Sequence, residues 1–108
     1  MELSQWFRVS FDEHNVYRHV APPGQVEWSD EFAWGEVIRV CLEAQDFTGA
    51  DSLYIFVRQR SESYVIPLEA EGGQEVFAEL IRRKLFDAEL AIRAASITEG
   101  LFFWPEAN

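Results

Sequence analysis

Hydrophobic and polar residues alternate along several short segments in the first two thirds of the chain. Such alternation is typical of β-strands that bury one face. A turn at residues 13–15, where Asn15 can adopt a positive φ, joins the first two segments and predicts an N-terminal hairpin. The strands expected from this pattern are residues 6–12, 16–21, 38–44, 52–59 and 64–67.

Four of the middle segments carry further information. In residues 38–44 the alternation puts Ile38 on the buried face and Cys41 on the exposed face. Residues 52–59 are apolar on both faces, which predicts a central strand. Residues 28–34 fit either a short strand or a turn of helix, and residues 46–51 are expected to form a loop.

The hydrophobic period changes after Gly72 and Gly73. Apolar residues then recur at helical spacing, which predicts an amphipathic helix; they are Val76, Phe77, Leu80, Ile81 and Leu85. Asp87 is a suitable N-cap for a second helix, and residues 101–104 are apolar enough to form a last strand. We therefore expect an α+β fold, with an antiparallel sheet of about six to seven strands followed by two C-terminal helices and a final strand.

Composition indicates one folded domain that covers residues 1–108. Of the 108 residues, 48% are hydrophobic, which argues against disorder, and the formal net charge is −10. Such a charge argues against nucleic acid and anionic membranes as partners, and it suits a basic protein partner. The single cysteine permits no internal disulfide, and the sequence has no leader-like or membrane-spanning apolar run. We expect a cytoplasmic protein that makes no membrane contact.

No motif in the sequence indicates a catalytic, metal-binding or cofactor-binding site. His14 and His19 lie near Asp12 and Glu13, but two histidines without a cysteine pair fall short of the usual zinc ligand set. Cys41 would need a neighbouring histidine to act as a nucleophile, and a mid-strand position favours an inert residue. The sequence therefore predicts that the chain is not an enzyme.

One segment combines aromatic and acidic residues in the manner of a protein interface. Tryptophan often supplies a large share of binding energy, and surrounding carboxylates would attract a basic partner. The alternative is that the aromatic side chains anchor the core and the acidic ones are merely solvated. The candidate partner-binding residues are Glu27, Trp28, Asp30, Glu31 and Glu36.

Several short motifs resemble those of a group of small, uncharacterised bacterial single-domain α+β proteins. They are Trp-x-x-Val-x-x-Val at residues 34–40, Asp before an aromatic strand at 51–54, Pro-x-x-Ala-x-Gly at 67–72, Phe-Asp at 86–87 and an aromatic end at 103–104. The order of strands is also similar to that of pleckstrin-homology-like domains. The resemblance covers about residues 7 to 104 and implies a fold, with no activity for any residue.

Two functional hypotheses follow from these observations. The first is a non-catalytic acidic interaction protein, in the manner of an immunity or antitoxin protein that inhibits a basic toxin. The alternative is a small ligand-binding module or enzyme with a pocket between sheet and helices. The sequence leaves the oligomeric state open, although the apolar terminal strand is a candidate for self-association.

Overall fold

A computed structural model describes residues 2–45, 51–97 and 99–106 of the chain. In these ranges the chain is α+β, as the sequence predicts, with helices α1 (Gly73–Arg82) and α2 (Ala88–Ala95) placed between the sixth and seventh strands. The strands are β1 (Phe7–Phe11), β2 (Asn15–Val20), β3 (Trp28–Ala33), β4 (Val37–Ala44), β5 (Ser52–Val57), β6 (Tyr64–Pro67) and β7 (Gly100–Trp104). Two short 3₁₀ helices, η1 (Leu3–Gln5) and η2 (Trp34–Glu36), complete the fold.

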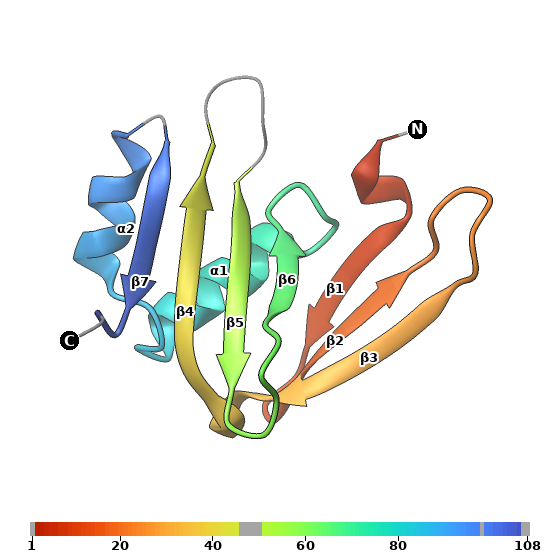
Figure 1. The fold of residues 1–108 in the computed structure, drawn as a ribbon, viewed down its shortest axis with the longest axis horizontal. Helices are drawn as coiled ribbons and strands as arrows, with labels where there is room; N and C mark the ends of the chain where they lie inside the picture. The colour runs from red at the N-terminus through yellow and green to blue at the C-terminus, as the bar shows by residue number, and fades with distance from the viewer. Residues whose placement is uncertain (1, 46–50, 98, 107–108) are drawn as a thin grey trace.

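The strands form two antiparallel sheets. Sheet A has the order β1-β2-β3, and sheet B has the order β6-β5-β4-β7. Strand β5 is flanked on both sides, as its apolar faces predict. Figure 1 shows the two sheets splayed apart and joined at one end, where β3 continues through η2 into β4. Residues 28–34, which fit either a strand or a helical turn, thus contain both.

The core lies between the inner face of sheet A, one face of sheet B and α1. Alternate strand residues point into it because successive side chains on a strand point to opposite faces. Helix α1 lies behind sheet B in the view of Figure 1 and contributes Val76 and Leu80, which are fully buried. They pack in one cluster with strand residues that include Val16, Val40, Leu53, Ile55 and Ile66.

Backbone hydrogen bonds tie the outer edge of β1 to the segment that precedes α1. The Val9 N–H donates to the Glu71 carbonyl over 2.8 Å, and the Glu71 N–H donates to the Phe7 carbonyl over 3.0 Å. Gly72 follows with a φ of +84°. This link places the first turn of α1 beside sheet A.

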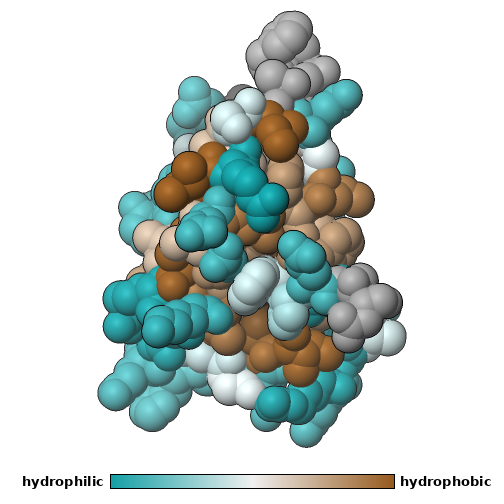
Figure 2. Space-filling view, turned by 90° about the vertical axis from the view of Figure 1, so that its left-hand side faces the viewer, coloured by the Kyte–Doolittle hydropathy of each residue, from teal (hydrophilic) through white to brown (hydrophobic). Residues whose placement is uncertain are grey.

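Helix α2 begins at the predicted N-cap. The Asp87 Oδ2 accepts a hydrogen bond of 3.0 Å from the Leu90 N–H. Leu90 and Ala94 are buried, whereas Ile92 on the opposite side is exposed. Figure 2 looks onto the side of the molecule that carries α2 and β7, where apolar residues lie among polar ones. None of the helices in the described ranges has the length and apolar character needed to cross a bilayer.

Strand β4 departs from the simple alternation that its sequence shows. The register with β5 shifts between Val37 and Arg39, and Ile38 is 49% exposed although the pattern puts it inside. A bulge inserts one extra residue and moves the alternation to the other face. Cys41, expected to be exposed, is buried, since it pairs with the large residues Tyr54 and Phe103 of the neighbouring strands.

Candidate functional site

The outer face of sheet A gathers more carboxylates than any single sequence segment suggests. Strand register places Arg8, Ser10, Tyr17 and His19 on this face, opposite the core. Glu31 reaches it from β3 and Glu27 from the position just before β3, and Glu71 and Glu75 border it from the segment where α1 begins. We define the acidic face by the five carboxylates of Asp12, Glu27, Glu31, Glu71 and Glu75.

A groove of about 570 Å³ crosses the acidic face between the strands and the start of α1. Polar side chains and a short stretch of backbone line it: Arg8, Val9, Ser10, Tyr17, His19, Glu71, Gly72 and Glu75. Val9 and Glu71, which the backbone hydrogen bond joins, both line it. Arg8 is the single arginine on this face, so its described side chains carry a clear excess of negative charge.

Neighbouring side chains hold three of the carboxylates in place. The Asn15 Nδ2 donates to the Glu31 carboxylate over 2.6 Å, and the His19 Nε2 lies 2.8 Å from the Glu27 carboxylate. The Tyr17 hydroxyl donates to Asp12 over 2.7 Å. Because these carboxylates are already oriented, binding a cation would require little additional ordering of side chains.

The Asp12 carboxylate is the most strongly stabilised charge on the face. The Tyr17 hydroxyl and the backbone N–H groups of Asn15 and His14 lower the pKa of Asp12 from 3.8 to about 2. The same bond raises the pKa of the Tyr17 phenol, because it is donated by the protonated form. Asp12 therefore keeps its negative charge throughout the neutral and mildly acidic range.

This arrangement predicts a specific pH dependence. Because the pKa of Asp12 is depressed in the folded state, its contribution to stability is complete above about pH 4 and is lost as the pH falls towards 2. The Asp12→Asn variant is expected to unfold at lower denaturant concentration than the parent at neutral pH, with the difference closing near pH 2. Urea titrations across this pH range measure the effect.

A carboxyl titration by NMR supplies the control for this expectation. In the Tyr17→Phe variant the pKa of Asp12 should rise towards 3.8, because the hydroxyl is the largest cause of its depression. An unchanged Asp12 titration in this variant would contradict the assignment.

The structure places the five sequence-predicted partner-binding residues in three different parts of the fold. Glu27 and Glu31 lie on the acidic face. Trp28 and Asp30 lie on the inner face of sheet A, where both contact Arg18. Glu36 belongs to η2, and its Oε2 is buried without a hydrogen-bond partner among the described residues.

Three carboxylates of the acidic face, those of Asp12, Glu71 and Glu75, were missed at the sequence level. Asp12 had a local signal, since it continues the polar face of the first strand. Glu71 and Glu75 had none, because they reach the face only through the pairing between Glu71 and β1.

Two further side chains that could take part in chemistry are His19, which contacts neighbouring side chains, and Cys41, which is buried. His19 contacts Ser29 through Nδ1 at 2.8 Å and Glu27 through Nε2. In the described ranges, no three His, Cys, Asp or Glu side chains are grouped so that they would hold a metal ion. Burial raises the pKa of the Cys41 thiol, which disfavours the nucleophilic thiolate. Residues 46–50 of the loop expected at 46–51 lie outside the described residues, and the Asp51 carboxylate accepts a hydrogen bond from the Gln45 N–H.

Comparisons with protein-family models, with curated proteins and with solved structures find no match to this chain. Its function has to be inferred from its own residues.

Proposed function

We propose that this chain is a non-catalytic acidic binding protein whose acidic face captures a basic protein, in the manner of an immunity or antitoxin protein. The observation that carries the proposal is the gathering of five carboxylates beside a single arginine on one sheet face. A surface potential of one sign steers an oppositely charged partner and raises its association rate. Basic toxins that act on nucleic acid would be suitable partners, because their cationic sites already accept phosphate.

The shape of the face favours a protein over a small ligand. Small-molecule sites are mostly enclosed and apolar, with a few polar groups that orient the ligand. The groove on the acidic face is open and bordered by charged residues, and the space between sheet B and α1 is filled by Ile55, Val76 and Leu80. A broad partner surface with several lysines or arginines fits this geometry better than a compact metabolite.

The proposal predicts that loss of two carboxylates from the acidic face weakens cation binding more than an equal change elsewhere. The probe is a peptide of about ten residues rich in lysine and arginine, titrated by calorimetry at low salt. An exposed ion pair contributes up to about 1 kcal/mol, so Glu27→Gln with Glu31→Gln should weaken binding roughly tenfold. Amide shifts of the parent chain should move mainly along β1, β2 and the start of α1.

A second double variant controls for net charge. Glu62 and Glu89 are exposed carboxylates outside the acidic face, so Glu62→Gln with Glu89→Gln changes the total charge by the same amount. This variant should bind the peptide nearly as the parent does. Equal weakening in the two double variants would show attraction by overall charge alone, and would refute a dedicated face.

A further inference from the structure

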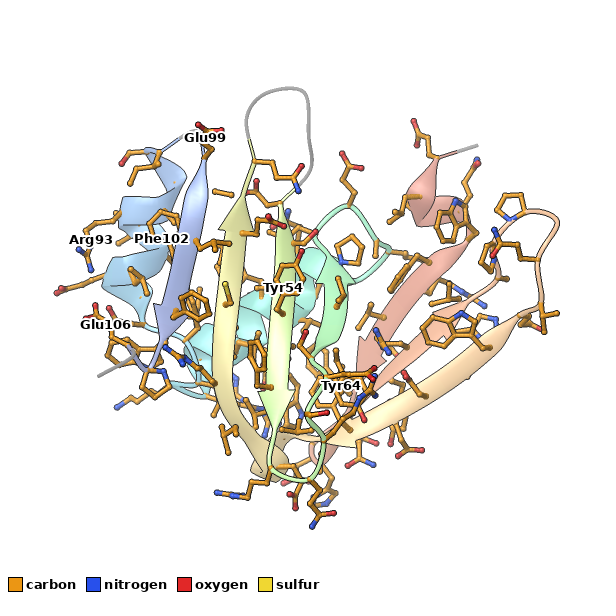
Figure 3. The ribbon with its side chains drawn as sticks, in the orientation of Figure 1. Tyr54, Tyr64, Arg93, Glu99, Phe102 and Glu106 are labelled. Atoms are coloured by element: carbon orange, nitrogen blue, oxygen red, sulfur yellow. The ribbon has the colours of Figure 1, made fainter. Side chains whose placement is uncertain are left out.

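Sheet B has one face that no described element covers. Helix α1 lies behind the sheet and α2 lies beside β7, so the face that carries Tyr54 is turned towards the viewer in Figures 1 and 3. Strand register puts a continuous set of apolar and aromatic residues on it. We define the open face by Cys41, Tyr54, Phe56, Val65, Leu101 and Phe103.

The open face is electrically balanced in a chain whose formal charge is −10. Strand register adds two charged residues to it, Arg39 and Glu43, which lie four positions apart on β4. Copies of an acidic chain repel one another over most of their surfaces. On the open face this repulsion is reduced, because its two charged residues have opposite signs, and apolar area is available there for burial.

Arg39 lacks a carboxylate partner within the described residues. Its guanidinium carbon lies 4.6 Å from the centroid of the Phe103 ring, and its Nε is buried without a hydrogen bond to any residue that the structure describes. Glu43, at the other end of the face, accepts a hydrogen bond of 2.7 Å from the Tyr54 hydroxyl. The cation and the anion are therefore both held against the sheet, but too far apart along β4 to pair with each other.

We propose that the open face is a dimer interface, at which two copies of this chain pack sheet B against sheet B. A two-fold axis near Cys41 would run the two β4 strands antiparallel and bring Arg39 of each copy opposite Glu43 of the other. Such an interface is self-complementary, as two-fold symmetry requires. The inference is independent of the acidic face, which remains accessible on the other sheet.

The size of the sheet sets the expected affinity. Four strands about 4.8 Å apart, each about five residues long, cover only about 300 Å² in projection. That is small beside the roughly 800 Å² per partner of a standard interface, so we expect a weak, concentration-dependent dimer.

Sedimentation equilibrium over a range of protein concentrations tests the proposal. Leu101 and Ile92 are both exposed apolar residues, at 58% and 72%, but only Leu101 lies on the open face. Leu101→Asp should abolish dimerisation, because it adds a second negative charge beside Glu43. Ile92→Asp makes the same change on α2 and should leave the dimer intact, while circular dichroism checks that both variants fold.

A charge exchange tests the orientation of the two copies. Arg39→Glu and Glu43→Arg should each weaken the dimer at least tenfold, and the two combined should restore it. A parent chain that stays monomeric to about millimolar concentration would overturn the proposal, as would equal loss in the two aspartate variants. Binding of the monomer to neutral phosphatidylcholine vesicles through Leu101 would assign the open face to lipid instead.

Discussion

Replacing Arg18 with alanine is expected to lower the free energy of unfolding by about 3 kcal/mol, since it leaves a partly buried carboxylate and a carbonyl without their donor. Arg18 carries a charge, but it is only 7% exposed because it points into the molecule from the middle of β2. Its Nε and Nη2 donate to the two Asp30 oxygens over 2.8 and 2.6 Å, and its Nη1 donates to the Val65 carbonyl over 2.9 Å. One side chain therefore joins sheet A to strand β6 of sheet B.

Aromatic rings complete the surroundings of this guanidinium. Its central carbon lies 4.9 Å from the centroid of the Trp28 ring and 5.0 Å from that of Tyr64. Contacts of this kind strengthen as water is excluded. Truncation to alanine would therefore remove packing between the sheets in addition to charge.

Two comparisons make the Arg18 prediction specific. Arg93 is exposed on α2, so Arg93→Ala should change stability by less than about 0.5 kcal/mol. The double variant Arg18→Met with Asp30→Leu should recover most of the loss, because apolar residues of similar size can replace a buried ion pair at little cost. Urea unfolding measures all three variants. A similar cost for the two alanine variants would show that Arg18 does not hold the sheets together.

Arg18 also gives two of the sequence-predicted partner-binding residues contacts within the fold, although Trp28 remains 41% exposed. Trp28 and Asp30 have the composition of a binding surface, yet both lie on the inner face of sheet A and contact this arginine. Nothing in residues 27–36 reveals a cation that lies nine or more positions earlier in the chain. Glu27 and Glu31 fall on the outer face because the side chains of a strand alternate.

Local patterns were sufficient to predict most of the strands, both α-helices and the α+β class, but they left residues 28–34 undecided between strand and helical turn. The alternation in β1 and β5, the helical stripe of α1 and the cap at Asp87 each depend on residues close in sequence. The partition into two sheets depends on which strands pair, and periodicity carries no information about partners. The sequence pattern also failed to predict that Ile38 is exposed. The bulge responsible is a register shift between β4 and β5, so it too depends on how strands pair.

The acidic face illustrates the same limit. Asp12, which follows β1, and Glu31 in β3 are placed on it by strand alternation once the strands are recognised. Glu71 and Glu75 join it only because the backbone of Glu71 bonds to Phe7 and Val9, more than sixty positions earlier. The start of α1 therefore contributes to the site through a contact that no sequence motif predicts.

Gly72→Ala is expected to destabilise the fold by about 3 kcal/mol or more, because it strains the backbone and breaks this long-range contact. Gly72 has a φ of +84°, which disfavours any side chain, and an added Cβ would lie 2.0 Å from the Val9 carbonyl oxygen. Relief of that overlap requires α1 to move away from β1. The hydrogen bonds between Glu71 and β1 would then break, and the groove on the acidic face would widen.

Two other glycines separate strain from steric overlap. Gly24 has a φ of +72° with nothing within 4 Å of a built Cβ, so Gly24→Ala should cost only about 1 kcal/mol of backbone strain. Gly35 has neither a positive φ nor a close neighbour, and Gly35→Ala should be nearly neutral. In urea unfolding, the loss of stability should be largest for Gly72→Ala, smaller for Gly24→Ala and smallest for Gly35→Ala. Amide exchange at Val9 and Glu71 should accelerate in Gly72→Ala alone. If Gly72→Ala proved no worse than Gly24→Ala, close packing of α1 on β1 would be disproved, and with it the placement of Glu71 and Glu75 beside the strand carboxylates.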